Sequence, residues 1–171
     1  TVARVLDRVR RTAPVPAGPN LGHAHDGIRF IDPAKAAIQP ATWLAAFQAA
    51  LDAGTGVADD TLDAIRHHVG RYSPADFLPT PAHRDALFRV LRPRPGLYAR
   101  LSEMHDCGLL ARLVPPFQAI TCRVVRDFYH KYTVDEHTLL AIRNVERLAD
   151  APDYRQRFAS LARDLQAPGS P

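Results

Sequence analysis

Proline and glycine divide this chain of 171 residues into many short segments. It holds 15 prolines and nine glycines. Proline lacks the backbone N–H that regular structure uses, and glycine adopts the left-handed conformations that end helices. The chain shows no internal repeat and no low-complexity tract. We therefore expect many short elements joined by tight turns.

Short helices are predicted where apolar residues recur at helical spacing between a start signal and a stop signal. Residues 42–53 place Trp43, Leu44 and Phe47 on one side, and Gly54 follows as a left-handed stop. Two later segments begin with a hydroxyl residue and then proline, which is typical of an N-cap and the first helical position. These signals predict further helices over residues 1–11, 60–69, 81–91, 96–107 and 154–165, and another that begins at residue 74. Asp60 is the predicted cap of the helix over 60–69, and residues 109–113 are expected to form a short turn.

The β content is expected to be small. Gly27–Ile31 and Ala36–Ile38 are apolar runs separated by Asp32-Pro33, and they could form a hairpin that is stable only when it packs on helices. Residues 12–20 contain three prolines and Gly18, so we interpret them as a linker without regular structure. The predicted fold class is mainly α, a helical bundle-like connector with a small β-hairpin near residues 27–38.

Composition excludes several classes of protein. The chain is 46% hydrophobic, enough to bury a core, and its net charge is only +4. Its arginines occur singly or in pairs, which favours a solvated surface over a nucleic-acid-binding one. The apolar runs are shorter than the ~20 residues that a membrane helix needs. Cys107 and Cys122 form no Cys-x-x-Cys motif, and we expect both to be reduced in a cytoplasmic protein.

The stretch from Asp127 to Leu139 organises the second half of the chain. Thr133 and Glu136 have the spacing of a capping box, so a helix is expected to begin here. His137 lies one turn into that helix, at the edge of its apolar stripe, where we expect it to border the core. The stripe at helical spacing consists of Val134, Thr138, Ala141, Ile142, Val145, Leu148 and Ala149.

This stretch also resembles a known family. Its sequence is Asp-x-Phe-Tyr-His-x-Tyr-Thr-Val-Asp-Glu-His-Thr-Leu, and Ile-Arg-Asn-Val and Arg-Leu follow it. It is similar to the segment that opens the HD phosphohydrolase domain of bacterial PII uridylyltransferase/uridylyl-removing enzymes. Earlier motifs agree, namely Gly96-Leu97, Met104-His105, Gly108-Leu109-Leu110 and Pro115-x-Phe117. The resemblance is good from about Trp43 to Leu148 and weak before it.

The resemblance implies a domain order. In that family a nucleotidyltransferase domain comes first, then an all-helical connecting region, the HD domain and tandem ACT domains. By this comparison residues 1–20 are the end of a preceding domain and a linker, 21–126 the helical connecting domain, and 127–171 the first helices of a truncated HD domain. The whole enzyme would transfer UMP from UTP to the PII nitrogen-regulatory protein when glutamine is scarce and hydrolyse it off when glutamine is plentiful. The implied partners are thus PII, UTP and glutamine, with no nucleic acid and no membrane.

The resemblance assigns His137 to the first metal ligand of the HD site, which would hold Mg²⁺ or Mn²⁺. The remaining ligands would lie beyond Pro171, so we expect this chain alone to be inactive and to bind no metal tightly, since one imidazole cannot hold a catalytic metal against water. Alternatively, His137 is a core-edge histidine that donates to a helix carbonyl. His130 and Tyr132 match family positions and would contact substrate. Alternatively, Tyr129 and Tyr132 are packing anchors.

Other chemical signals are absent or have structural explanations. The dipeptides His25-Asp26 and His105-Asp106 precede His137, which is the wrong order for an HD site, so we interpret them as turn and packing residues. The adjacent His67 and His68 point about 100° apart on a helix and cannot share one ion. No Asp-x-Asp pair, Walker loop or nucleophile elbow occurs. A free-standing helical interaction domain without catalysis is the alternative function, and flanking gene sequence would discriminate the two.

Overall fold

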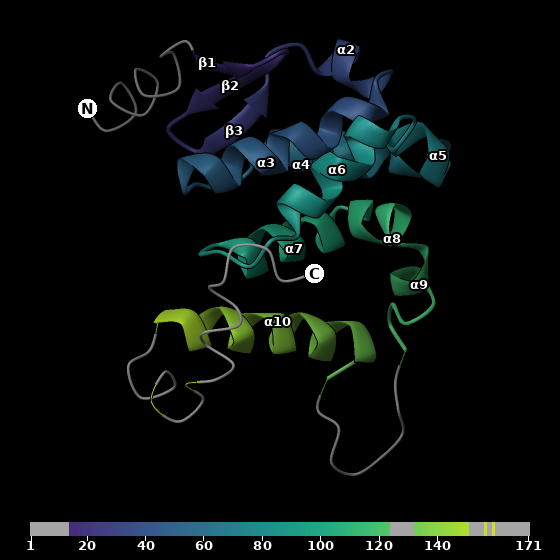
Figure 1. The fold of residues 1–171 in the computed structure, drawn as a ribbon. Coiled ribbons are helices and arrows are strands. Elements are labelled where there is room, and N and C mark those ends of the chain that lie inside the picture. The colour runs from purple at the N-terminus through teal and green to yellow at the C-terminus, as the bar shows by residue number, and fades with distance from the viewer. Residues whose placement is uncertain (1–13, 124–131, 151–155, 157–158, 160–171) are drawn as a thin grey trace, which may run out of the picture.

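The computed structural model of this chain describes residues 14–123, 132–150, 156 and 159 (Figure 1). It is mainly helical with one small sheet, which confirms the predicted fold class. The strands are β1 (Val15–Gly18), β2 (Leu21–Ala24) and β3 (Gly27–Phe30). The helices are α2 (Pro33–Ala37), α3 (Trp43–Ala53), α4 (Asp59–His68), α5 (Pro74–Phe77), α6 (Pro81–Val90), α7 (Leu97–Asp106), α8 (Leu109–Leu113), α9 (Pro115–Gln118) and α10 (Val134–Asp150).

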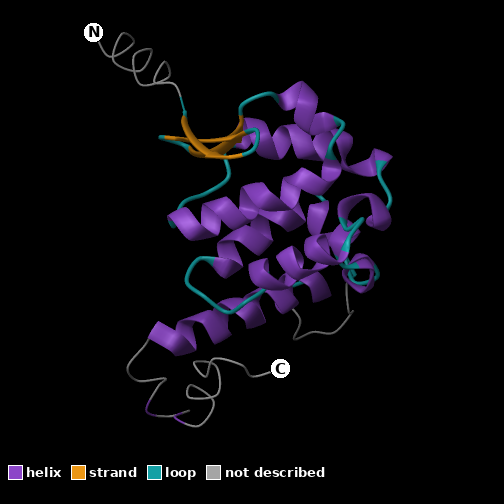
Figure 2. Cartoon of the chain, turned by 45° about the horizontal axis from the view of Figure 1, so that its top comes forward, coloured by secondary structure: helices purple, strands orange, loops and turns teal. Residues whose placement is uncertain are grey.

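The helices are stacked in layers beneath the sheet. Figure 1 shows the sheet at the top, α3, α4 and α6 below it, then α7, and α10 at the bottom. Figure 2 shows the same order, with the strands confined to one end of the molecule. Helix α3 contacts β3, α6 and α7, and α7 contacts α10. The stack therefore connects the sheet to α10 through α3 and α7.

The sheet is antiparallel with the order β1-β2-β3. Leu21 pairs with Phe30 and Ala24 with Gly27, across a turn formed by His25 and Asp26. Gly27 has a φ of +127°, and a Cβ there would lie 2.4 Å from the Gly56 carbonyl oxygen, so this crossing requires glycine. The turn interpretation of His25-Asp26 is confirmed.

The predicted second strand of the hairpin is wrong, because its residues form a helix. Asp32 accepts a hydrogen bond from the Lys35 N–H at 3.0 Å and caps α2, and Pro33 takes the first helical position. Capping by aspartate and the fixed φ of proline outweigh the apolar character of Ala36 to Ile38. Strand β3 pairs instead with β2, which the sequence analysis did not predict.

The proline-rich segment predicted as a linker contains strand β1. Pro16 pairs opposite Gly22, and the register shifts between Pro16 and Gly18. Among the strands of the described residues, β1 has a neighbour only in β2. Proline is tolerated in such an edge strand because its missing N–H costs no internal ladder bond.

The core is centred on Trp43, whose side chain is 1% exposed. Its indole Nε1 donates to the Ala36 carbonyl at 2.8 Å, and its ring packs edge-on to Tyr72 at 5.7 Å and tilted to Phe77 at 5.6 Å. Around it lie the largest other buried apolar side chains, namely Ile28, Phe47, Ile65, Val90, Met104 and Leu109. One continuous core therefore joins the sheet to α7 and α8.

Several predicted helix boundaries are confirmed. Gly54 ends α3 with a φ of +64°, Ser73 and Asp76 form a capping box on α5, and α6 begins at Pro81. The predicted Asp60 cap is wrong, because α4 already begins at Asp59. The predicted helix over residues 1–11 and most of the one over 154–165 lie outside the described residues. No helix in the described ranges is both long and apolar enough to cross a membrane.

Candidate functional site where α10 meets α7

Helix α10 begins where the capping signal predicts. The Thr133 N–H donates to Glu136 Oε2 at 3.1 Å, and the His137 N–H donates to the Thr133 carbonyl at 2.9 Å. These contacts close the first turn and satisfy amides that would otherwise have no partner. The helix then continues to Asp150. The turn that carries His137 is thus locally well defined.

The inner face of α10 differs from the predicted apolar stripe. Val134, Thr138 and Ile142 are half-buried, but Ala141 and Val145 are exposed. The inner face consists of buried Asp135 and Leu139 with half-buried Ile142 and Glu146. That set has the helical spacing i, i+4, i+7, i+11. The inward face is therefore rotated by part of a turn from the predicted apolar stripe. An apolar pattern could not reveal this, because two of the inward residues are carboxylates.

Asp135 is almost fully buried, with 1% of the residue exposed. Its Oδ2 accepts a hydrogen bond from the Cys122 N–H at 3.0 Å and lies 3.3 Å from Nε2 of His105 on α7. Burial raises the pKa of this carboxyl, but interactions with the Thr133 side chain and with backbone N–H groups, including that of Cys122, outweigh burial and hold the pKa below its ordinary value. Asp135 is therefore an anion that joins α10 to two other segments.

His105 is held from two sides. Its ring packs edge-on to Phe117 of α9 at 5.5 Å, and its Nε2 faces Asp135. The sequence dipeptide His105-Asp106 is thus no functional pair, because the partner of His105 lies 30 residues further along the chain. The predicted packing role of His105 is confirmed.

Glu146 forms a second attachment at the other end of the interface. Its Oε1 accepts from the Gly96 N–H at 2.6 Å and its Oε2 from the Tyr98 N–H at 2.8 Å. These are amides at the N-terminus of α7, where a carboxylate is also favoured by the helix dipole. The Arg143 guanidinium lies 5.4 Å from the centre of the Tyr98 ring. Sequence reasoning missed both Asp135 and Glu146, although Asp135 lies inside the motif it quoted.

His137 is exposed, on the side of α10 away from α7. Successive helical residues are about 100° apart, so His137 lies about 200° from Asp135 and from Leu139, which both point inward. The expectation that it borders the core is wrong for this reason. Within the described part of the chain no hydrogen bond or ion pair to its ring is found.

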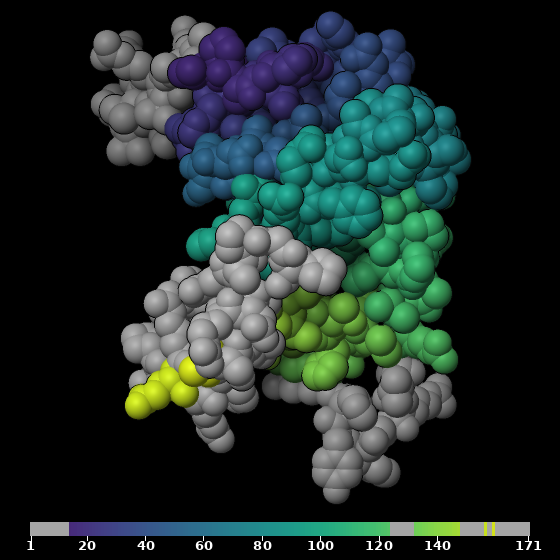
Figure 3. Space-filling view, viewed as in Figure 1, coloured from purple at the N-terminus to yellow at the C-terminus, as the bar shows by residue number. Residues whose placement is uncertain are grey.

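Beside this interface lies a hollow of about 310 Å³. Tyr132 is 48% exposed and lines it together with Tyr98, His105 and Glu136. In Figure 3 the visible surface of α10 is yellow-green and lies low in the described part of the molecule. His130, the other predicted substrate contact, lies outside the described residues. The structure therefore brings Tyr132 near His105 but not near the His137 side of the helix.

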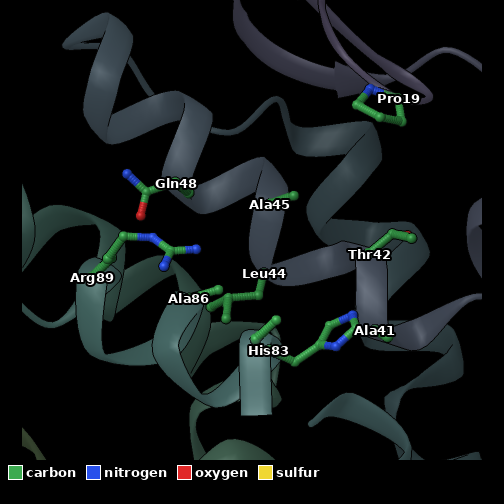
Figure 4. Close-up of a pocket in the computed structure, with 10 residues that line it drawn as sticks. Pro19, Ala41, Thr42, Leu44, Ala45, Gln48, His83, Ala86 and Arg89 are labelled. Carbon is green, nitrogen blue, oxygen red and sulfur yellow. The ribbon is translucent and has the colours of Figure 1, made fainter. Parts of the chain in front are cut away.

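A second hollow, of about 350 Å³, lies between α3 and α6 (Figure 4). It is lined mainly by small apolar side chains, including Ala45 and Ala86. In Figure 4 the polar groups stand at its two ends, Gln48 and Arg89 at one and His83 at the other. His83 Nδ1 is already paired with the Thr80 hydroxyl at 2.7 Å. This groove assembles no catalytic group of side chains.

Comparisons with known proteins identify similar sequences. The bifunctional uridylyltransferase/uridylyl-removing enzyme of Thiobacillus denitrificans is 40% identical over 96 residues, which are 56% of this chain and 11% of that enzyme. The enzyme of the same name from Bordetella pertussis is 33% identical over 103 residues, 60% of this chain and 12% of the relative. That from Rhodospirillum rubrum is 32% identical over 124 residues, 72% of this chain and 13% of the relative.

This chain is similar to one segment of these enzymes. The resemblance predicted from the motifs is thereby confirmed, and the chain spans about a tenth of the length of these relatives. No protein-family model matches the chain, and no solved structure matches it. The similarity is therefore one of sequence, and it covers only this segment of the relatives.

Helix α10 offers His137 as one metal ligand, and the described residues do not complete a metal site around it. His137 offers an exposed imidazole on a capped turn. Among the described residues no group of three or more His, Cys, Asp and Glu side chains could hold a metal ion. A divalent ion needs several protein ligands. His137 could thus serve as one ligand of a metal site whose other ligands come from residues outside the described ones.

Proposed function

We propose that this chain is the helical connector, with the first helix of the HD domain, of a bifunctional uridylyltransferase/uridylyl-removing enzyme. Support comes from 40% identity to such an enzyme over 96 residues. In the whole protein the chain would link a nucleotidyltransferase domain to a hydrolase domain. Its own contribution is mechanical: α3 and α7 form a packed stack that carries α10.

The proposed substrates are those of the whole enzyme. UMP from UTP would be transferred to the PII signalling protein and removed by hydrolysis, with glutamine as the regulatory ligand. The removal reaction would use Mg²⁺ or Mn²⁺, which lowers the pKa of bound water and polarises a phosphoryl oxygen when it is present. His137 would supply one ring nitrogen to that ion. Cytoplasmic location and the absence of a tightly bound metal in this chain alone belong to the same proposal.

We also propose Tyr132 and His130 as substrate contacts. The Tyr132 side chain is 48% exposed at the start of α10 and its hydroxyl can donate or accept a hydrogen bond. It lines the hollow beside His105 rather than the face that carries His137. A contact to the protein substrate therefore suits Tyr132 better than a contact to the reacting phosphate.

The test is His137→Ala in the full-length protein. We expect loss of uridylyl removal, with uridylyl transfer retained because the transferase domain needs no residue of α10. The matched control is His67→Ala, an exposed histidine of α4 whose ring Nδ1 bonds only within its own helix, at 2.9 Å from the Asp63 carbonyl. Unchanged removal by His137→Ala would contradict the metal role of His137. Absence of both activities from the unmodified full-length protein would favour the alternative, a helical interaction domain without catalysis.

A further inference from the structure

Three segments of the chain meet at one buried carboxylate, two residues before His137. Asp135 of α10 contacts His105 of α7 and the backbone of Cys122, which follows α9. Cys122 itself has a left-handed backbone conformation, with a φ of +55°, which is uncommon for a residue other than glycine. The backbone there is held in a sparsely populated state while it donates to Asp135.

We propose that Asp135 is a positioning residue that fixes the rotation of α10 about its axis and thereby the place of the His137 ring in the metal site. The proposal rests on the proposed function, because it presumes that His137 is a ligand. Asp135 touches neither metal nor substrate in this account. It acts through the helix turn that it shares with His137.

The geometry makes metal binding sensitive to this rotation. An α-helix with its side chains is about 10–12 Å in diameter, so a rotation of about 20° moves an outer atom by about 2 Å. Metal–ligand distances tolerate only about 0.2 Å. His137 points to the side opposite Asp135, so any rotation at Asp135 is carried in full to the imidazole.

The other contacts of α10 define its rotation less strictly. Leu139 and Ile142 pack by apolar contact, which has no preferred direction. Glu146 makes directional bonds, but it lies nine residues from His137, about 13.5 Å along the axis at 1.5 Å per residue. The first turn can therefore shift while Glu146 stays bound. Near the ligand, Asp135 is the directional side-chain contact, and the Val134 N–H adds a backbone bond to the Arg123 carbonyl at 3.0 Å.

A merely stabilising role is the competing explanation, and Glu146→Gln is its matched control. Both Asp135→Asn and Glu146→Gln replace an inward carboxylate of α10 with its amide and remove one acceptor oxygen. Both should lower the midpoint of thermal unfolding. Only Asp135→Asn should also weaken the metal site.

The experiment compares Asp135→Asn, Glu146→Gln and His137→Ala in the full-length protein by calorimetric titration with Mn²⁺, thermal unfolding, and kcat and KM for uridylyl removal. Removing the support of a metal ligand typically costs 10–100-fold in affinity, so we expect Asp135→Asn to weaken Mn²⁺ binding about tenfold and to lower kcat more than it raises KM. Glu146→Gln should leave Mn²⁺ affinity within about twofold.

The outcomes separate this inference from the proposed function. Equal Mn²⁺ affinities for Asp135→Asn and Glu146→Gln overturn the positioning role, while a loss of affinity in His137→Ala keeps the proposed function. Unchanged affinity in His137→Ala overturns both. Should Asp135→Asn fail to fold, His105→Leu removes the α7 contact of Asp135 and keeps an apolar side chain against Phe117, while the Cys122 N–H bond to Asp135 remains. Weaker Mn²⁺ binding by His105→Leu than by Glu146→Gln would then support the positioning role, and equal binding would overturn it.

Discussion

The Trp43 core and the α7–α10 interface are held together by different forces. Around Trp43 the contacts are apolar and aromatic, with one indole hydrogen bond to the Ala36 carbonyl. At the α7–α10 interface a buried leucine, Leu139, lies between two inward carboxylates. Asp135 accepts a hydrogen bond from the Cys122 N–H after α9, and Glu146 accepts one from the Gly96 N–H at the start of α7. The first region stabilises the fold without fixing fine geometry, and the second fixes how one helix is oriented.

This difference matters for function because apolar burial is non-directional and hydrogen bonds to carboxylates are directional. A helix that must present one side chain to a metal needs contacts of the second kind. A core that only has to keep its helices together can depend on the first. Mutations in the two regions should therefore have different signatures.

The largest effect is expected in the core. Trp43→Ala should lower the free energy of unfolding by about 3–5 kcal/mol, because it creates a cavity and removes the indole hydrogen bond to the Ala36 carbonyl, which keeps its bond from the Gln39 N–H. Denaturant unfolding followed by circular dichroism measures this. Phe88→Ala, at a residue that is 67% exposed, should change stability by less than about 0.5 kcal/mol. Similar losses for both would mean that the core is not centred on Trp43.

A smaller and more local loss is expected at the interface. Glu146→Ala leaves the Gly96 and Tyr98 amides without their acceptor, which should cost about 1–2 kcal/mol. Hydrogen exchange should accelerate at those two amides and along α10, while amides of α3 keep their protection. Arg147→Ala, at an exposed neighbour, is the control. Protection lost equally in α3 would contradict the division into two regions.

Surface charges on the core side should contribute less still. Hydrogen bonding by Gln48, together with Arg94, holds the pKa of Asp52 below its ordinary value despite partial burial. A lowered folded-state pKa contributes stability that is present above the unfolded value, about 3.9, and is lost as pH falls through the folded one. Asp52→Asn should thus cost under about 1 kcal/mol at pH 7 and less at pH 2. A larger loss of stability at pH 2 than at pH 7 would contradict the predicted pH dependence.

The smallest effect is expected from metal added to the 171-residue chain. One exposed imidazole binds Mn²⁺ weakly. The midpoint of thermal unfolding should therefore stay unchanged in about 1 mM Mn²⁺, because a ligand stabilises the folded state only when its concentration approaches or exceeds its dissociation constant. Calorimetry should show no tight site. A sub-micromolar isotherm would mean that this chain supplies more ligands of the site than His137.

Sequence reasoning succeeded where a local signal determines the structure. The hydroxyl-proline starts of α5 and α6, the glycine after α3 and the capping box at Thr133 all act within one turn of helix, so their residues predict the boundaries directly. It failed in β1 and β2, where Val15–Gly18 and Leu21–Ala24 carry no alternating apolar pattern. They are strands because β1 pairs with β2 and β2 also pairs with β3.

The inner face of α10 was missed for a different physical reason. Asp135 and Glu146 appear from the sequence to be surface residues, since carboxylates are rarely buried without a partner. Their partners, Cys122, His105, Gly96 and Tyr98, lie on other segments, and the sequence does not show that these segments meet. Long-range polar partners therefore decided which side of the helix faces inward, and with it the exposure of His137.

The most direct test of the account is the position of a metal in crystals of the full-length protein grown with Mn²⁺. We predict an anomalous peak about 2.0–2.3 Å from a ring nitrogen of His137, with Asp135 still bonded to the Cys122 N–H and Glu146 to the Gly96 and Tyr98 N–H groups. Mn²⁺ bound elsewhere, with the His137 ring in solvent and α10 still docked on α7, would contradict it.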